Sequence, residues 1–556
     1  MINYKANPLN LSDDDIRWVE ETYISMSIEE RIGQLFCPIG YSSDKGYLTN
    51  AILSKHPGGI LFRTGGKDEM AATYGFLQKN SRIPMFTAAN LEAGGDGIVK
   101  EGTSFGKQMQ IAATGKVENA YRLGKICSRE AKAVGCNYAF APVVDIDFNW
   151  RNPITNVRTY GSDPEKVIDF AREYERACRE EGILTSIKHF PGDGVDERDQ
   201  HILTSINSLE KDQWLASYGK VYSTLIQEGA KSIMVGHIAL PAFEEKNEII
   251  PATLSPSILK GLLRNALGFN GLIISDATPM VGFTSAMERR IAVPYSIMAG
   301  IDMFLFNKDY DEDYAYMMEG YKKGNLTEER LEEAVKRILA IKASLGLHRK
   351  ENGPEKDYEA YLQCPEHLKW AQECASDAIT LVKDTQKILP LDSVKHHRVL
   401  YEILGDSASN ERITETFLEK MREEGFEMIP YEKEVFDFTK PLPFDTVSGF
   451  REKYDLVIYL GNIENASNKT TNRINWYTLF GLGNNMPWFV KEVPTIFISL
   501  QNPYHLFDVP MVSTYINCYS NHNVVIEELV KKLTGKDSFR GVSPVDPFCG
   551  KEYLKK

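Results

Sequence analysis

The stretch Ile183-Leu184-Thr185-Ser186-Ile187, followed directly by Lys188-His189-Phe190-Pro191-Gly192-Asp193-Gly194, predicts a buried strand that ends in a polar, glycine-rich loop. The same loop then carries Asp199-Gln200-His201. In barrels of parallel strands, the side chains that do chemistry lie where a strand ends and its loop begins. A loop can fold the Asp199 carboxylate onto one nitrogen of His201, which fixes the tautomer of the imidazole and stabilises its cation. The stretch therefore predicts both a barrel strand and an active site.

A second buried strand is predicted for Gly271-Leu272-Ile273-Ile274-Ser275, and it ends abruptly in the carboxylate of Asp276. Together with an aspartate-supported histidine earlier in the chain, this carboxylate gives one nucleophile or base and one proton donor. Two such groups are sufficient to hydrolyse a glycoside.

Apolar runs of strand length alternate with charged segments of helical period, such as 117–133, 163–181 and 326–341. This alternation is typical of repeated β-α units. Eight runs are candidate strands of a (β/α)8 barrel: 33–38, 59–62, 84–89, 138–144, 184–187, 232–235, 272–275 and 303–306.

A barrel places the side chains that follow its strands at one mouth. The polar residues in such positions are Arg63, Asn90, Asp145, Lys188, His189, His237 and Asp276. The alternative for some of them, Asp145 and His237 especially, is a purely structural role with satisfied hydrogen bonds.

The chain has 556 residues with 43% hydrophobic content, enough for more than one domain. We predict a catalytic barrel over residues 1–350, a linker over 351–370 and a smaller α/β domain over 371–556. Within the second domain, strands are expected at 398–404, 456–460 and 495–500, with a helix at 411–424.

The net charge is −13, and lysines and arginines form no long run, so nucleic acids and anionic membranes are poor partners. The first residues lack the pattern of a signal peptide, and no run of about 18 apolar residues occurs, so we expect a cytoplasmic protein. Eight dispersed cysteines without a Cys-x-x-Cys pair indicate reduced thiols, with neither a zinc site nor a disulfide framework.

These motifs resemble those of family 3 glycoside hydrolases, and the resemblance covers nearly the whole chain. The combination Lys-His-Phe-Pro-Gly-x-Gly with a following Asp-x-His, which matches Asp199 and His201, is similar to the branch of two-domain β-N-acetylglucosaminidases that uses an Asp-His dyad as acid/base. Ser275-Asp276 resembles the nucleophile motif of the family, and the segment 378–391 resembles its entry into a C-terminal α/β sandwich.

The resemblance also implies the residues that bind the sugar. Arg158, within a segment that resembles the family's arginine motif, and the pair Lys188 and His189 fall on such positions. Asn90 stands where the family usually has an aspartate that holds the far hydroxyls, and an amide is a weaker acceptor than a carboxylate. Asp193 stands where many members of the branch have a second histidine.

From this resemblance we expect a retaining, exo-acting β-N-acetylglucosaminidase that needs no cofactor and no metal. Asp276 is expected to attack the anomeric carbon, while His201, oriented by Asp199, protonates the leaving oxygen and later activates water. The partner is a small carbohydrate, with fragments of short glycans favoured over polymers. Trp476 of the second domain is a candidate sugar contact, with packing between domains as the alternative.

Three alternatives remain open. After donating its proton His201 is neutral and does not repel an anion, so inorganic phosphate could replace water and make the enzyme a β-N-acetylglucosaminide or β-glucoside phosphorylase. A catalytically silent sugar-binding protein on the same frame is the second alternative. A metal-dependent hydrolase is the least favoured, because neither His-x-x-x-His nor a cluster of carboxylates is present. The oligomeric state is not indicated.

Overall fold

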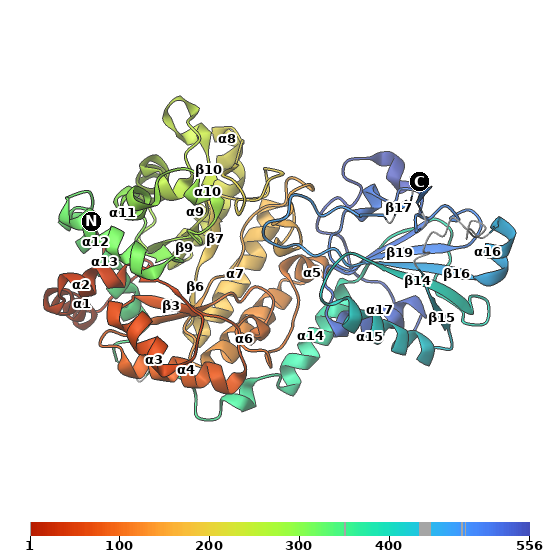
Figure 1. Ribbon diagram of the computed structural model, residues 1–556, viewed down its shortest axis with the longest axis horizontal. Coiled ribbons are helices and arrows are strands. Elements are labelled where there is room, and N and C mark those ends of the chain that lie inside the picture. The colour runs from red at the N-terminus through yellow and green to blue at the C-terminus, as the bar shows by residue number, and fades with distance from the viewer. Residues whose placement is uncertain (1, 350–351, 433–445, 477, 480–481, 484) are drawn as a thin grey trace. The chain divides into compact units, whose positions relative to one another are not determined.

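The computed structural model describes residues 2–349, 352–432, 446–476, 478–479, 482–483 and 485–556. These residues form two compact units, one comprising residues 1–105 and 117–368 and the other comprising 106–116 and 369–556 (Figure 1). No helix within the described ranges is both long and apolar enough to cross a membrane.

The first unit contains a ring of parallel strands. They are β1 (Phe36–Cys37), β2 (Ile39–Gly40), β3 (Gly59–Phe62), β4 (Phe86–Ala89), β5 (Tyr138–Ala139), β6 (Leu184–Thr185), β7 (Ile187–Phe190), β9 (Ser232–Val235), β11 (Leu272–Ser275) and β12 (Phe304–Leu305). Hydrogen bonds join β2 through β6 in chain order, β7 to β9 to β11, and β1 to β12. A parallel bridge between Ile274 and Met303 links β11 to the start of β12 and closes the ring. The predicted (β/α)8 barrel is confirmed, because each of the eight predicted runs contains one of these strand segments.

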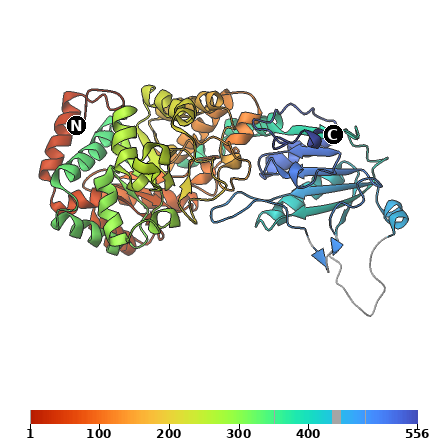
Figure 2. The same ribbon diagram turned by 90° about the horizontal axis from the view of Figure 1, so that it is seen from above.

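Helices surround the strands, as Figures 1 and 2 show. They are α1 (Asp13–Ser25), α2 (Ile28–Gln34), α3 (Lys45–Tyr47), α4 (Lys67–Asn80), α6 (Glu118–Ala133), α7 (Pro164–Glu181), α8 (Lys211–Trp214), α9 (Lys220–Gln227), η9 (Ser257–Ala266), α10 (Val281–Thr284), α11 (Arg289–Ala299), α12 (Tyr310–Lys322) and α13 (Glu328–Ser344). A short parallel pair, β8 (Ser205–Ile206) with β10 (Ile238–Ala239), lies outside the ring. The three predicted helical segments correspond to α6, α7 and α13.

Local sequence explains why α7 begins and ends where it does. The side chain of Asp163 accepts a hydrogen bond from the Glu165 amide, and Pro164 occupies the first helical position, where its missing N–H costs nothing. Gly182 ends the helix in a left-handed conformation with φ 75°. The chain then enters β6 and β7, the strands that carry Lys188 and His189 to the mouth of the barrel.

The second unit is built on a six-stranded sheet in the order β13-β20-β19-β16-β14-β15. The strands are β13 (Thr380–Asp384), β14 (Arg398–Leu404), β15 (Glu427–Pro430), β16 (Leu456–Gly461), β19 (Thr495–Ser499) and β20 (Thr514–Asn517). All neighbouring pairs are parallel except β13 with β20. The three strands predicted for this region correspond to β14, β16 and β19. A two-stranded ribbon, β17 (Thr478–Leu479) with β18 (Leu482–Gly483), is separate from this sheet.

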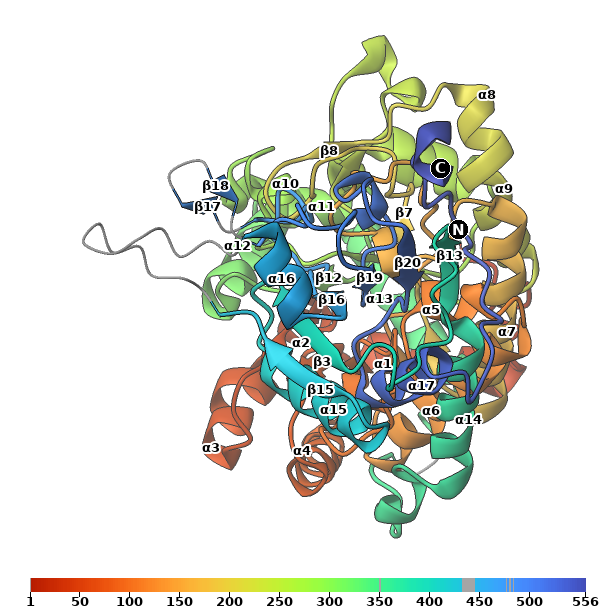
Figure 3. The ribbon, with the colours of Figure 1, turned by 90° about the vertical axis from the view of Figure 1, so that its right-hand side faces the viewer.

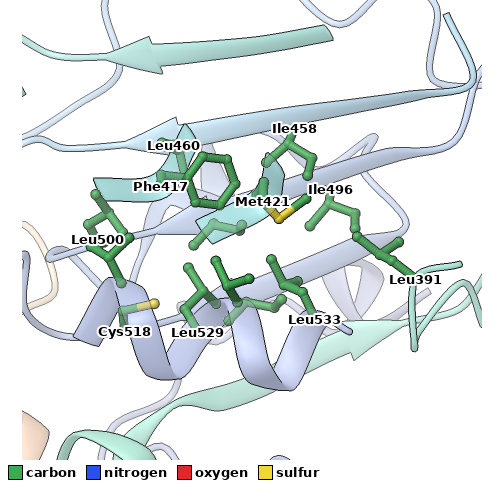
Figure 4. Close-up of a cluster of buried hydrophobic side chains, with 14 of the residues drawn as sticks. Leu391, Phe417, Met421, Ile458, Leu460, Ile496, Leu500, Cys518, Leu529 and Leu533 are labelled. Carbon is green, nitrogen blue, oxygen red and sulfur yellow. The ribbon is translucent and has the colours of Figure 1, made fainter. Parts of the chain in front are cut away.

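Helices cover both faces of the sheet (Figure 3). Apolar side chains of α15 (Asn410–Glu423) and α17 (Asn523–Leu533) pack against one face, where Phe417 and Leu529 meet Ile458 and Ile496 (Figure 4). Phe450 of α16 (Val447–Lys453) belongs to the apolar cluster on the other face. The pattern of the sequence predicted an α/β domain here, and this arrangement is the α/β sandwich that the family resemblance implied.

One segment differs from the predicted organisation. Residues 106–116, which include α5 (Gln108–Ala113), group with the second unit although they lie within the range predicted for the barrel. Lys107 Nζ donates to Gln501 Oε1 at 3.0 Å, and the Val542 amide donates to the Ala113 carbonyl at 2.9 Å. The predicted linker 351–370 contains a short 3-10 helix, Tyr358–Tyr361, and the start of α14 (Pro365–Ala378).

Candidate active site

Asp276 directly follows β11 at the carboxyl end of the barrel. Its amide donates to the Val235 carbonyl of the neighbouring strand at 2.8 Å, which fixes the backbone at this point. Burial alone would raise the pKa of Asp276, but the nearby histidines His189, His237 and His201 and a hydrogen bond from the Ala277 amide at 2.7 Å outweigh it, and the pKa is lowered. The side chain is 15% exposed. Asp276 is therefore a carboxylate anion that a substrate can reach.

His189 lies on β7 and is held rigidly beside Asp276. Its Nδ1 lies 2.7 Å from Asp145 Oδ2, and its backbone amide donates to Asp145 Oδ1 at 3.1 Å. Asp145 is fully buried. The other ring nitrogen, Nε2, lies 3.9 Å from Asp276 Oδ2. Asp145 therefore orients His189 towards the candidate nucleophile.

His201 and Asp199 form the predicted pair within the loop after β7. Nδ1 of His201 lies 2.6 Å from Asp199 Oδ1, and the His201 amide donates to the same oxygen at 2.9 Å. Asp199 is fully buried, whereas the His201 side chain is 24% exposed. With Nδ1–H directed at the carboxylate, Nε2 is the atom that can exchange a proton with a substrate.

The loop is anchored to the segment that follows Asp276. The Val281 amide donates to the His201 carbonyl at 3.0 Å, and the Gly282 amide donates to the Gln200 carbonyl at 3.2 Å. A side chain at Gly282 would collide with these partners, because a Cβ there would lie 2.7 Å from the Gln200 oxygen. The structure thus brings the loop of His201 to the end of the strand that carries Asp276.

Glu92 joins the two cationic residues that were predicted to bind the sugar. It accepts two hydrogen bonds from Arg158, both at 2.9 Å, and its Oε1 lies 2.7 Å from Lys188 Nζ. Burial raises the pKa of Glu92, but the two cations outweigh it and hold the pKa well below its usual value. Sequence reasoning missed this role, although Glu92 follows the end of β4 and so has the position that marked the other candidates.

The remaining candidates at the barrel mouth have contrasting surroundings. Asn90, directly after β4, has an exposed side chain. His237 is fully buried, with Nδ1 2.9 Å from Thr253 Oγ1 and Nε2 3.0 Å from the Ala277 carbonyl. Burial lowers the pKa of His237 to about 4, so it is neutral and its hydrogen bonds are satisfied. These contacts are those of a structural histidine.

Asp193 is a buried residue of the loop after β7, and the pKa of its carboxyl group is raised. Burial and the neighbouring charge of Asp145 raise its pKa to about 7. Its Oδ1 accepts hydrogen bonds from Asn152 Nδ2 at 3.0 Å and from the Gly194 amide at 2.7 Å. Where many members of the branch have a second histidine, this chain therefore has a titrating carboxyl group next to the Asp145–His189 pair.

Comparison with known proteins identifies the family. The sequence profile described as "Glycosyl hydrolase family 3 N terminal domain" matches residues 27–341. The chain belongs to glycoside hydrolase family 3. It is 44% identical over 563 residues to "Beta-N-acetylglucosaminidase/beta-glucosidase" from Cellulomonas fimi, with 99% of each chain covered.

Solved structures of family 3 proteins have the same fold. "Beta-glucoside phosphorylase BglX" superposes with a TM-score of 0.93 at 41% identity, covering 99% of this chain and 100% of that one. A glycoside hydrolase family 3 β-N-acetylglucosaminidase from Paenibacillus sp. str. FPU-7 gives a TM-score of 0.79 at 22% identity, with 94% and 99% covered. The predicted family is confirmed, and the chain is a family 3 enzyme that acts on β-glycosides.

Trp476, the candidate from the second unit, lies at the edge of a pocket of about 460 Å³ in that unit. Its ring meets Tyr459 edge-on, with centroids 6.0 Å apart. Asn475 and Arg473 line the same pocket. The contact between Trp476 and a sugar stays a prediction.

Proposed function

We propose that this family 3 enzyme is a retaining, exo-acting β-N-acetylglucosaminidase that removes N-acetylglucosamine from the non-reducing ends of short glycans. The observation that carries this proposal is the pairing of an anionic, reachable Asp276 with a partly exposed His201 that a buried aspartate orients. A nucleophile and a separate proton donor are the two groups that a double displacement at an anomeric carbon needs.

In the first step, an oxygen of Asp276 forms a bond to the anomeric carbon as the glycosidic C–O bond breaks. The proton on His201 Nε2 moves to the departing oxygen, and Asp199 stabilises the imidazolium before this transfer. Imidazole in general has a pKa of about 6.5, close to neutral pH, whereas a glutamic acid would need deep burial to hold a proton there. A partly exposed loop can therefore supply the acid.

In the second step, the neutral imidazole of His201 takes a proton from water as the water oxygen attacks the anomeric carbon. The bond to Asp276 breaks, and the carboxylate is restored. Two inversions at the same carbon retain the β-configuration of the released sugar.

The sugar is held by the polar groups around the nucleophile. Arg158 and Lys188 carry two positive charges against one carboxylate of Glu92, and their remaining donors are available to hydroxyl oxygens. His189 Nε2 and the exposed Asn90 complete the set. The preference for an N-acetyl group is supported by the sequence motif of the branch and by the name of the relative from Cellulomonas fimi.

Phosphorolysis is the second candidate. In this reaction phosphate, in place of water, attacks the glycosyl-enzyme and yields a sugar 1-phosphate. A neutral imidazole beside the acceptor does not repel the phosphate dianion, whereas a carboxylate general base would. The 41% identity to the structure named β-glucoside phosphorylase supports this candidate specifically.

One experiment separates these reactions. The protein is incubated with p-nitrophenyl β-N-acetylglucosaminide or p-nitrophenyl β-glucoside, with and without inorganic phosphate, and the sugar product is identified by mass spectrometry. Free sugar formed at a rate that ignores phosphate supports the hydrolase, and a sugar 1-phosphate supports the phosphorylase. Ligand binding without turnover of either substrate would overturn both and leave a silent sugar-binding protein.

A further inference from the structure

A pocket of the barrel unit lies at the opposite end of the strands from Asp276. Its volume is about 530 Å³, within the range of small-molecule sites. Phe269 and Asn270, which line it, precede β11, and Gly300 precedes β12. Asp276 follows the carboxyl end of β11, so a ligand in this pocket would not occupy the active site.

The pocket is strongly cationic. Four of its lining residues carry a positive charge and one a negative charge: Lys260, Arg264, Arg330 and Arg337 against Glu333. A further carboxylate, Asp302, is fully buried and accepts hydrogen bonds from Arg264 at 2.5 Å and from Arg330 at 2.8 Å. Glu333 lies 3.3 Å from Arg330 and 2.9 Å from Arg337, so each arginine contacts at least one carboxylate. The four cations share only two carboxylates, which leaves a net charge of +2.

The three guanidinium groups are held in place by the protein before any ligand arrives. Arg264 donates to the Phe269 and Gly271 carbonyls, and Arg330 donates to the Ile297 and Ile301 carbonyls. The Arg337 side chain is only 2% exposed. An excess of buried positive charge is costly, so this preorganised excess needs an explanation other than stability.

Two observations indicate that the two carboxylates do not fully balance the three guanidinium groups. Arg337 donates to Glu333 Oε1 and to the Asn270 carbonyl through its terminal nitrogens, but its Nε is buried without a hydrogen-bond acceptor and lies 3.5 Å from Asp302 Oδ2. Burial, together with the charges of Arg337 and Arg330, lowers the pKa of Arg264 to about 9 despite its contact with Asp302. An anion in the pocket would relieve this repulsion.

We propose that this pocket, at the amino ends of β11 and β12, binds a small phosphate ester of monosaccharide size. Guanidinium groups match the geometry of phosphate oxygens, and a phosphate monoester at neutral pH carries about −1.5 to −2 charges, close to the excess of the pocket. Lys260, an exposed residue that lines the pocket, adds a further cation. The exposed Asn265 offers an amide group to the hydroxyls of the sugar.

The test measures binding of glucose 6-phosphate to the full-length protein by calorimetry at constant ionic strength, with glucose and inorganic phosphate as separate titrants. Lys260→Glu and Asn265→Asp each make the pocket more negative. Both positions are exposed, so neither substitution should prevent folding. Lys166→Glu makes the same charge change as Lys260→Glu at an exposed position of α7, away from the pocket, and is its matched control. Hydrogen exchange with mass spectrometry locates the bound ligand.

Saturable binding of glucose 6-phosphate is expected, with Kd raised at least about tenfold by each pocket variant and less than about twofold by the control. Protection from exchange is expected in 257–270 and 326–340. The proposal is overturned if protection appears only around 188–201 and 276, or if the pocket variants bind as the control does. Because the readout is binding at a site away from Asp276, this result is independent of whether the enzyme hydrolyses or phosphorolyses its substrate.

Discussion

The mouth of the barrel contains two histidine–aspartate pairs of nearly identical geometry. In each, Nδ1 of the histidine lies within 2.7 Å of the carboxylate of a fully buried aspartate, Asp145 for His189 and Asp199 for His201. They differ in position and exposure. His189 lies on strand β7 and its side chain is 7% exposed, whereas His201 lies on a loop and its side chain is 24% exposed.

This difference teaches that an aspartate–histidine pair has no fixed role. On a strand and buried, the pair presents a ring at a constant place, which suits the positioning of a substrate and of Asp276. On a loop and partly exposed, the same pair can approach a leaving group and exchange protons with an incoming acceptor. The surroundings of each pair, more than its internal geometry, decide which function it can serve.

The largest effect is expected for the group that both pairs serve. Asp276→Ala should reduce kcat roughly ten-thousand-fold or more, because no glycosyl-enzyme can form. Azide should restore part of the turnover of an activated aryl glycoside and give an α-glycosyl azide, which NMR identifies. Retained activity in this variant would remove Asp276 as nucleophile, and with it the common target of the two pairs.

The loop pair should show a dependence on the leaving group. His201→Ala or Asp199→Asn should lower kcat/KM roughly 100- to 10,000-fold for a disaccharide, the usual range for loss of a general acid. The loss should be far smaller for a 2,4-dinitrophenyl glycoside, because this leaving group departs without protonation. Equal losses for both substrates would contradict the assignment of His201 as the proton donor.

The strand pair should show no such dependence. His189→Gln removes a ring that contacts both Asp145 and the region of Asp276, and should lower kcat/KM about 10- to 100-fold for every leaving group. Asp145→Asn should also lower the melting temperature, since it leaves buried polar groups poorly matched. If His189→Gln instead behaves like His201→Ala across leaving groups, the contrast between the pairs is wrong.

The smallest effect concerns Asp193, which lies beside the strand pair. Its pKa is raised to about 7 in the folded protein from a value near 3.8 in the unfolded chain, so the folded state binds a proton that the unfolded state has lost. The contribution of Asp193 to the free energy of unfolding should therefore fall as pH rises from about 4 to 7 and then level off. The melting temperature is measured at pH 5 and at pH 8. Between these two values it should fall less in Asp193→Asn than in the wild-type protein, by about 2 °C or more.

Much of the barrel could be predicted because its strands are short, buried and continuous in sequence. Each predicted run, such as 232–235 and 272–275, contains a strand of the ring, and the rule that active groups follow barrel strands selected Asp276, His189 and Lys188 without further information. The pair Asp199 and His201 was predictable because both members lie within three residues of each other.

The rest depends on contacts between residues far apart in the chain. Glu92 and Arg158 are 66 residues apart, and His189 and Asp145 are 44 apart. Sequence alone therefore showed Arg158, His189 and Asp145 as separate candidates, missed Glu92, and revealed neither pair. The affiliation of residues 106–116 could not be predicted for the same reason, since α5 reads as an ordinary apolar segment between two parts of the barrel.

The grouping of residues 106–116 with the second unit affects how the protein folds during synthesis. A ribosome that has synthesised residue 368 has produced every residue of the barrel unit, yet α5 still lacks the chain that will surround it. The partners of this segment, Asp377, Gln501 and Val542, arrive only with the last third of the sequence. Neither unit is a continuous piece of the gene. A stop codon after residue 368 would therefore yield the barrel unit with residues 106–116 unfolded. The second unit could not be produced from residues 369–556 alone, because it would lack α5.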